Sequence, residues 1–144
     1  MTCKILIVDS DEMMRIFLRD VFWVHGGSAT TYEVETAKSV AEANTYLEQN
    51  AKQCPTIIFL DISAPNIGKR GRVAGIEESL QFIRKVKEES PCKNKTSIVI
   101  FSSYDDPSIR EKAKEAGASD FLVKGKYMPK EIVDFVEKHY VTRP

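Results

Sequence analysis

Residues 5–12 read ILIVDSDE, four consecutive aliphatic residues followed by three carboxylates and a serine. A continuous aliphatic run of this kind is typical of a strand that is buried on both faces of a parallel sheet. Similar runs follow at 56–60 (TIIFL) and 97–101 (SIVIF), and more polar ones lie at 32–37 (YEVETA) and 120–124 (DFLVK). The sequence therefore predicts five strands, and the three continuous runs are expected near the centre of one sheet.

Apolar residues between these runs recur with the period of an amphipathic helix. The residues that define the five patterns are Met14, Phe17, Leu18, Val21 and Phe22; Val40, Ala43 and Leu47; Ile76, Leu80 and Ile83; Ile109, Ala113 and Ala116; and Ile132, Phe135 and Val136. Ser39 and Asp106-Pro107 have the character of helix starts, and Gly117 that of a helix end. Strand alternating with helix predicts one doubly wound α/β domain over residues 1–144, with right-handed crossovers and no output domain.

The composition excludes several classes of protein. Hydrophobic residues make up 42% and charged residues 29% of the 144 residues, an ordinary balance for a globular domain. Lys+Arg and Asp+Glu number 21 each, so no net charge directs the chain to nucleic acid or to a membrane surface. No apolar run has the length of a membrane span, and the N-terminus does not resemble a signal peptide.

The three cysteines are Cys3, Cys54 and Cys92. Their number is odd and no pair has the CxxC spacing, which argues against both a disulfide framework and a zinc site. We therefore expect reduced thiols and a cytoplasmic location.

Polar residues follow the predicted strands at the point where each strand ends. They are Asp9, Ser10 and Asp11 after the first strand, Asp61 after the third, Ser102 and Ser103 after the fourth, and Lys124 at the end of the fifth. Ligands of such folds bind beyond the carboxyl ends of the strands. Clustered carboxylates repel one another unless a cation intervenes, and Mg²⁺ is the divalent ion that prefers oxygen ligands. Asp61 is then a candidate nucleophile toward a phosphoryl group, with Lys124 neutralising its oxygens.

The residues at these positions, and their spacing, resemble those of the receiver domain of two-component response regulators. Four segments carry the resemblance in order and at compatible spacing, from about Lys4 to Tyr140: ILIVDSDE, TIIFLDISAP, IVIFSSYDD and AGASDFLVK. The resemblance implies a flavodoxin-like domain, in which five helices cover a five-stranded parallel sheet of strand order 2-1-3-4-5.

The resemblance also implies a function. A sensor histidine kinase or a histidine phosphotransfer protein would donate a phosphoryl group to Asp61 in the presence of Mg²⁺ or Mn²⁺. The face formed by the fourth helix, the fifth strand and the fifth helix would then change and control binding of a downstream protein. Such a chain is a signalling domain rather than an enzyme, and it neither binds nucleic acid directly nor inserts into a membrane.

The residue roles implied by the family are as follows. Asp9, Asp61 and the backbone carbonyl of Ser63 hold the metal, with Ser10 or Asp11 as further candidates through water. Ser102 is the switch hydroxyl, Phe121 the switch aromatic residue and Lys124 the cation that meets the phosphoryl group. Ser63 and Tyr104 stand where the family tunes the lifetime of the acyl phosphate.

The sequence departs from the family in three places. Ser10 occupies the position of a second acid, so we expect weakened Mg²⁺ binding, and Asp11 is better suited to capping the first helix. Gly125 stands where proline usually follows the lysine, which predicts a freer turn. The segment 66–74 is longer than usual and contains Lys69, Arg70 and Arg72, so it is either a solvated insertion or a basic lip for an anionic partner.

Two other functions fit part of the pattern. A degenerate receiver would bind partners without being phosphorylated, which Ser10 and Gly125 would explain. A haloacid-dehalogenase-like phosphatase would use Asp9 as nucleophile and Asp11 as acid/base. That family needs a further acidic motif well beyond its lysine, yet only about twenty residues follow Lys124, and the phosphatase leaves Asp61 without a role.

Overall fold

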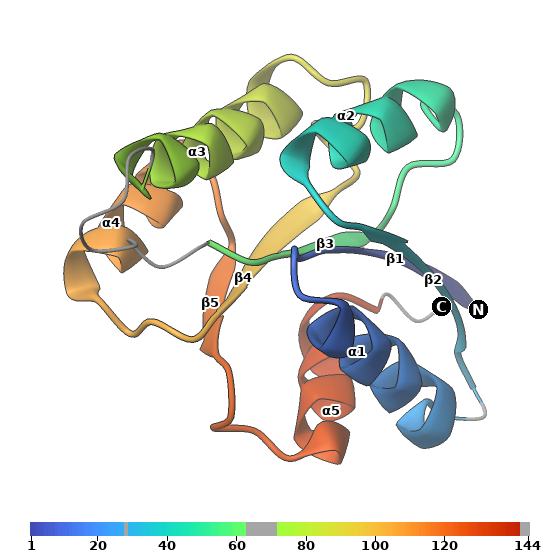
Figure 1. Cartoon of the computed structure of the whole chain (residues 1–144). Coiled ribbons are helices and arrows are strands. Elements are labelled where there is room, and N and C mark those ends of the chain that lie inside the picture. The colour runs from blue at the N-terminus through green and yellow to red at the C-terminus, as the bar shows by residue number, and fades with distance from the viewer. Residues whose placement is uncertain (28, 63–71, 142–144) are drawn as a thin grey trace.

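The computed structural model describes residues 1–27, 29–62 and 72–141, without the side chains of residues 72–75. The strands are β1 (Thr2–Val8), β2 (Thr31–Ala37), β3 (Ile57–Leu60), β4 (Ser97–Ser102) and β5 (Asp120–Val123). The helices are α1 (Glu12–His25), α2 (Val40–Gln49), α3 (Arg72–Glu88), α4 (Pro107–Ala116) and α5 (Pro129–His139). The predicted alternation of five strands with five helices is confirmed (Figure 1). None of the described helices is long and apolar enough to cross a lipid bilayer.

All strands pair in parallel, in the order β2-β1-β3-β4-β5. In this register Val8 lies beside Leu60, and Leu60 lies beside Ile100. The three continuous aliphatic runs therefore occupy the three central strands, as predicted, and their carboxyl ends reach the same edge of the sheet. The predicted flavodoxin-like fold is confirmed.

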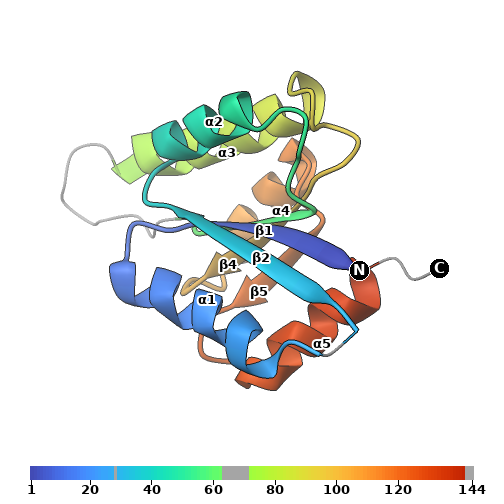
Figure 2. The same ribbon diagram turned by 90° about the vertical axis from the view of Figure 1, so that its right-hand side faces the viewer.

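The helices form a layer on each face of the sheet. Figures 1 and 2 show α2 and α3 above the sheet and α1 and α5 below it, while α4 continues the upper layer. Successive strand residues point to opposite faces. Leu6, Ile58 and Ile98 accordingly pack with α2, α3 and α4, whereas Ile5, Ile57 and Val99 pack with α1 and α5. A central strand must be apolar at every position because both of its faces are covered.

The ends of the helices are set by the residues that the sequence indicated. The Asp11 carboxylate accepts a hydrogen bond from the Met13 N–H at the start of α1, and the Ser39 hydroxyl accepts one from the Glu42 N–H at the start of α2. Both side chains satisfy backbone donors that have no partner within the helix. Gly117 ends α4 at a φ of 123°, a conformation that glycine adopts without steric cost. The expected capping role of Asp11 is confirmed.

The prediction of reduced thiols is wrong for two of the three cysteines. Cys54 and Cys92 form a disulfide with a Cα–Cα distance of 5.6 Å, although 38 residues separate them in sequence. Cys54 precedes β3 and Cys92 precedes β4, and these neighbouring strands bring the two loops together. Cysteine number and spacing do not report such proximity. Cys3 is free and buried, and burial raises the pKa of its thiol to about 11.

Candidate functional site

Three of the predicted site residues meet at the carboxyl edge of the sheet. Backbone hydrogen bonds extend the strand pairing by one residue at each position: the Asp9 N–H donates to the Ala37 carbonyl (3.0 Å), the Asp61 N–H to Val8 (2.9 Å) and the Lys124 N–H to Ser102 (2.8 Å). The backbone therefore holds three residues side by side at the carboxyl ends of three different strands: Asp9, Asp61 and Lys124.

The ammonium group of Lys124 joins both carboxylates. Its Nζ lies 2.8 Å from Asp9 Oδ2 and 3.1 Å from Asp61 Oδ1. The side chains of Asp9, Asp61 and Lys124 are 3%, 14% and 12% exposed, so solvent screens their interactions weakly. The three residues form a compact group with one excess negative charge.

The electrostatic balance differs between Asp61 and Lys124. Burial raises the pKa of Asp61, the Asp9 carboxylate raises it further, and Lys124 opposes both effects. Burial on its own would lower the pKa of Lys124, but the hydrogen bond to Asp9 and the attraction of both carboxylates raise it overall. Asp61 thus carries a charge that the fold disfavours, whereas Lys124 carries one that the fold stabilises.

Asp9 is fixed from several sides. Its Oδ1 accepts a hydrogen bond from the Asp11 N–H at 2.9 Å, and its backbone carbonyl accepts one from Arg15 Nη1 at 2.8 Å. The Asp11 carboxylate, in contrast, accepts from the Met13 N–H at the start of α1. Asp9 is therefore a rigid member of the site, and Asp11 lies beside it as a helix cap.

The Ser102 hydroxyl lies one strand away from the carboxylates and is fully buried. It accepts a hydrogen bond from the Tyr104 N–H at 3.0 Å and donates to the Ile62 carbonyl at 3.4 Å. The ring of Tyr104 is exposed. Ser102 thus connects the segment after β4 with the residue that follows Asp61.

Phe121 lies on β5, where its half-buried ring packs against the cluster under α4. The guanidinium group of Arg110, on α4, covers this ring at 4.6 Å from its centroid. A guanidinium at this distance from an aromatic face is attracted by a cation–π interaction. Arg110 also donates two hydrogen bonds to Asp105, which holds its head over the ring.

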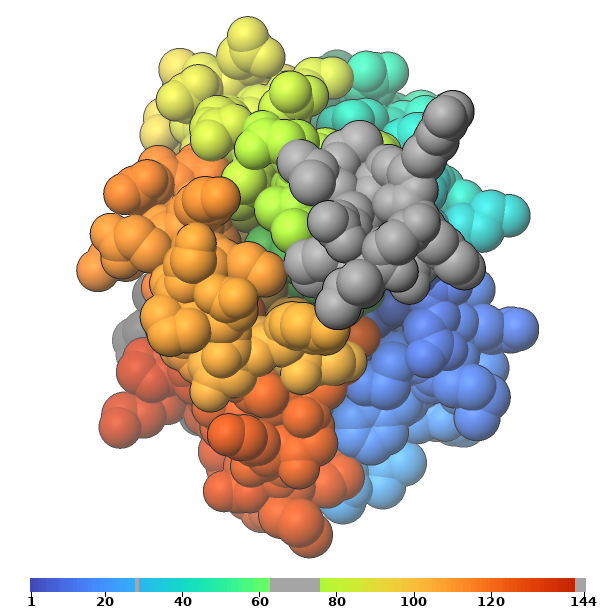
Figure 3. All heavy atoms as spheres, turned by 60° about the vertical axis from the view of Figure 1, so that its left-hand side comes forward, coloured from blue at the N-terminus to red at the C-terminus, as the bar shows by residue number. Residues whose placement is uncertain are grey.

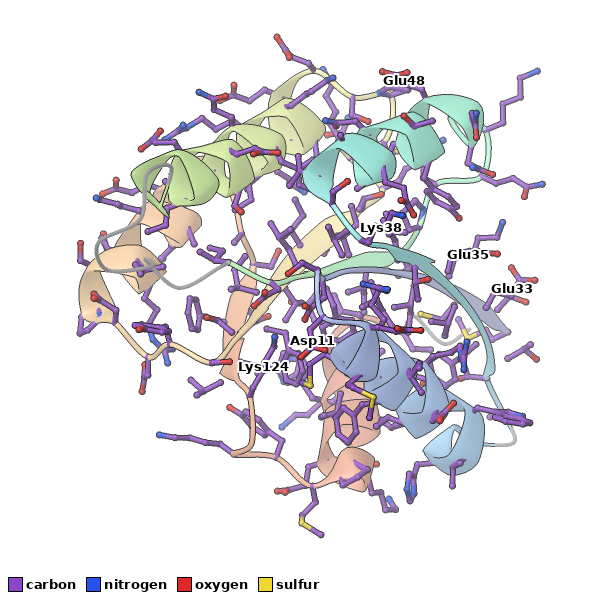
Figure 4. All side chains as sticks on the ribbon, in the orientation of Figure 1. Asp11, Glu33, Glu35, Lys38, Glu48 and Lys124 are labelled. Atoms are coloured by element: carbon purple, nitrogen blue, oxygen red, sulfur yellow. A yellow bond between two sulfur atoms is a disulfide. The ribbon has the colours of Figure 1, made fainter. Side chains whose placement is uncertain are left out.

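Two hollows adjoin the three charged residues. Asp9, Ser10 and Asp61 line a cleft of about 180 Å³ together with Lys38 and Glu78. Lys124 and Asp11 line a second hollow of about 450 Å³. Figure 4 shows Lys124 at the end of β5 near Asp11, and in Figure 3 the surface of α1 adjoins the surface that leads from β5 into α5.

Sequence reasoning did not identify Lys38 or Glu78 as lining residues of the cleft. Lys38 directly follows β2, so the rule that ligands bind beyond strand ends would have included it. Glu78 lies inside α3, and only packing of this helix against the sheet brings it to the cleft.

The donor set is compatible with Mg²⁺. This ion is commonly bound through one or two carboxylates while it keeps several waters, and Asp9 and Asp61 supply two oxygen ligands beside a polar cleft. Among the described residues no group of three or more His, Cys, Asp or Glu side chains is arranged to hold a metal ion. The neutral Ser10 also lines this cleft.

Gly125 forms the turn that directs Lys124 toward the carboxylates. The Lys126 N–H donates to the Val123 carbonyl at 3.3 Å, which closes a four-residue turn with Gly125 in its third position. Gly125 has a φ of 82°, and a type II turn requires a positive φ at that position. Proline, with φ fixed near −65°, does not fit there. Glycine at position 125 is thus compatible with the turn, and its expected greater freedom stays a prediction.

Two predictions concern residues outside the described part of the chain. Ser63, expected as a metal ligand and as a lifetime residue, belongs to them. So do positions 66–71 of the basic segment 66–74, including Lys69 and Arg70. The backbone is described again from Arg72, where α3 begins four residues before Ile76.

A doubly wound sheet of order 2-1-3-4-5, with two aspartates and a lysine at its carboxyl edge, defines the class of receiver-like α/β domains. The response regulator receiver domain family matches this sequence over residues 5–137. The chain belongs to this family. Receiver domains are signalling domains rather than classical enzymes, and they generally depend on Mg²⁺ and accept phosphoryl groups from histidine kinases or phosphotransfer proteins.

Two similar proteins differ in how much of their length is matched. Chemotaxis protein CheY of Thermotoga maritima is 27% identical over 135 residues, which cover 94% of this chain and 95% of that protein. Response regulator PleD of Caulobacter vibrioides is 30% identical over 124 residues, 86% of this chain but 23% of PleD. The chain therefore spans nearly all of one relative and about a quarter of the other.

Solved structures agree with the fold. A response regulator from Thermotoga maritima superposes with a TM-score of 0.72 at 25% identity, covering 96% of this chain and 97% of that one. A putative response regulator from Chloroflexus aurantiacus gives a TM-score of 0.69 at 28% identity, with coverage of 96% and 97%. These matches favour neither the haloacid-dehalogenase-like phosphatase nor the degenerate receiver.

Proposed function

We propose that the chain is a phospho-accepting receiver whose Asp61 takes a phosphoryl group from a phosphohistidine donor. The observation that carries the proposal is the position of Lys124 Nζ, within 3.1 Å of Asp61 Oδ1 and 2.8 Å of Asp9 Oδ2. An ammonium group beside a carboxylate nucleophile is the arrangement that phosphoryl transfer needs, because negative charge on the transferring oxygens requires a nearby cation.

The proposed reaction is a direct displacement at phosphorus. A carboxylate oxygen of Asp61 attacks, the phosphorus–nitrogen bond of the donor breaks, and the bonding electrons return to the imidazole. Asp61 is partly exposed at the edge of the sheet, so a donor can approach it from solvent. The fold disfavours its charge, which keeps the carboxylate poorly solvated and available for attack.

Two groups of this chain would then meet the transferred phosphoryl group. Lys124 would exchange its bond with Asp61 Oδ1 for one with a phosphoryl oxygen, while Asp9 continues to orient it. Ser102 would give up its long 3.4 Å bond to the Ile62 carbonyl and donate to another phosphoryl oxygen. Asp9, Asp61 and the Ser63 carbonyl would hold Mg²⁺, which would supply positive charge beside the phosphoryl oxygens. Ser10 and Asp11 would reach it only through water.

The response would reach the face formed by α4, β5 and α5. Movement of Ser102 shifts the segment after β4, which carries Tyr104 and Asp105. Because Asp105 holds Arg110 over Phe121, such a shift frees the ring to pack inward. This two-state packing would control binding of a downstream protein. Tyr104 and Ser63 would set the lifetime of the acyl phosphate by limiting access of water. A cytoplasmic location belongs to the same proposal.

The test is the intact mass of the protein after incubation with acetyl phosphate and Mg²⁺. We expect one phosphoryl adduct on the wild type and none on Asp61→Asn, whose side chain has the same shape but lacks the nucleophilic charge. An adduct that survives in Asp61→Asn and disappears in Asp9→Asn would support the phosphatase alternative. Absence of any adduct on the wild type would support the degenerate receiver and refute the proposal.

Ser10 is expected to limit the affinity for Mg²⁺. Replacing Ser10 by aspartate adds a third carboxylate to the cleft, so Mg²⁺ should bind about tenfold more tightly, since affinity follows the number of charged ligands. Isothermal titration calorimetry on both proteins measures the change.

The matched control is Gln53→Glu, which adds the same charge at the opposite edge of the sheet, where Gln53 accepts a hydrogen bond from Lys4. This variant should bind Mg²⁺ as the wild type does. Equal affinities of the Ser10→Asp variant and the wild type would show that position 10 does not contribute to the metal site.

A further inference from the structure

The Cys54–Cys92 disulfide lies at the amino edge of the sheet, opposite the carboxylates. It joins the loop between α2 and β3 to the loop between α3 and β4. Nothing in the proposed phosphoryl transfer uses this bond. The surroundings of its two sulfurs nevertheless differ, and this difference affects which sulfur an external thiolate can attack.

The two half-cystines differ in their access to solvent. Cys92 is fully buried in the cluster under α2, α3 and α4. Cys54 is half-buried and lines an open hollow of about 510 Å³ at the sheet edge. Thiol–disulfide exchange depends on which sulfur a thiolate can reach. Solvent therefore has better access to Cys54 than to Cys92, and attack is expected at Cys54.

The hollow beside Cys54 is basic. Three lysines line it, Lys4, Lys52 and Lys95, against a single carboxylate, Glu33. Glu33 lies 3.7 Å from Lys4 and offsets part of that one charge. The volume is in the range of small-molecule sites, and the excess of ammonium groups favours an anionic occupant.

We propose that this hollow is a thiol-exchange site at which a small carboxylate-bearing thiol reduces the Cys54–Cys92 bond. The thiolate of the first molecule attacks Cys54 Sγ, a mixed disulfide forms, and Cys92 leaves as a thiolate that takes up a proton. A second thiolate attacks the sulfur of the small molecule in the mixed disulfide and releases Cys54. Two thiols are oxidised to one external disulfide, and the two electrons pass to the protein.

The test uses the oxidised full chain with three thiol probes: glutathione as the anionic one, 2-mercaptoethanol as the neutral one and cysteamine as the cationic one. Each exchange rate is divided by that of the same probe with a small reference disulfide. We expect glutathione to react several-fold faster than the other two after this correction. The preference should be lost in Lys52→Gln/Lys95→Gln and kept in Lys112→Gln, a control lysine exposed on α4.

The site of attack is tested separately with variants that lack one of the two half-cystines, treated with oxidised glutathione. Cys92→Ser should acquire the mixed disulfide at Cys54, whereas Cys54→Ser should stay unmodified while it remains folded by circular dichroism. Equal corrected rates for the three probes, or modification at Cys92, would overturn the proposal. Three thiols that all react with alkylating agent in the air-oxidised, denatured protein would overturn it as well.

Discussion

Replacement of Lys124 by methionine is expected to lower the free energy of unfolding by about 2–4 kcal/mol in EDTA at pH 7.5. Methionine keeps the length of the side chain but removes the charge that lies between Asp9 and Asp61. Both carboxylates are largely buried, at 3% and 14% exposure, so their repulsion is weakly screened once the ammonium group is gone. Urea denaturation of both proteins measures the difference.

The destabilisation caused by Lys124→Met is also expected to depend on pH. Burial and Asp9 raise the pKa of Asp61 in the folded protein, so the folded state binds the proton more tightly than the unfolded state does. Stability then falls as pH rises through the folded pKa, and it recovers as pH is lowered. Loss of Lys124 raises that pKa further. The destabilisation of Lys124→Met should therefore shrink between pH 7.5 and pH 5.

Lys130→Met is the matched control. Lys130 pairs with Asp134 at 3.0 Å, but these side chains are 71% and 61% exposed. Such a pair contributes about 0.5 kcal/mol or less, so this variant should unfold almost like the wild type. Asp61→Asn should restore part of the stability of Lys124→Met, because it removes one of the two repelling charges. Equal effects of the two lysine substitutions would contradict the account of the site.

Reduction of the disulfide is the second change with a large expected effect. The bond closes a loop of 38 residues, and the chain entropy that it removes from the unfolded state corresponds to about 4 kcal/mol. We expect dithiothreitol to lower the melting temperature by roughly 10 °C or more. Thermal unfolding followed by circular dichroism, with and without the reductant, measures the shift.

The controls use the other cysteines of the same chain. Cys54→Ala/Cys92→Ala should melt at one temperature regardless of dithiothreitol, because it has no bond to reduce. Cys3→Ala should keep the shift, since Cys3 is outside the bond. A wild type whose melting temperature does not respond to dithiothreitol, although its mass shows that the bond was reduced, would exclude a stabilising role.

The fold was largely predictable because the central strands are covered on both faces. Burial on both faces forces apolar residues at every position of β3, whose four residues are all buried, and such runs are visible without a structure. The start of α3 was harder to predict from the sequence. Helix α3 begins at Arg72, whereas the segment 66–74 was interpreted as an insertion, so the last three residues of that segment belong to the helix.

The site residues that directly follow strands could be predicted from the sequence. Those that reach the site only through the packing of helices could not. Asp9, Asp61 and Lys124 come directly after strands, and a parallel sheet must bring them to one edge. Glu78 reaches the cleft from within a helix, and Arg110 reaches Phe121 from another helix. Neither contact leaves a periodic signal. The disulfide was missed for the same reason, since only the pairing of β3 with β4 brings its two loops together.

The most direct test of the central claim locates the phosphoryl group on a single residue. After incubation with acetyl phosphate and Mg²⁺, borohydride cleaves an aspartyl phosphate and leaves homoserine, which peptide mass spectrometry assigns to a position. The account predicts homoserine at position 61 and at no other aspartate. Homoserine at position 9, or none at all in a protein that folds and binds Mg²⁺, would contradict it.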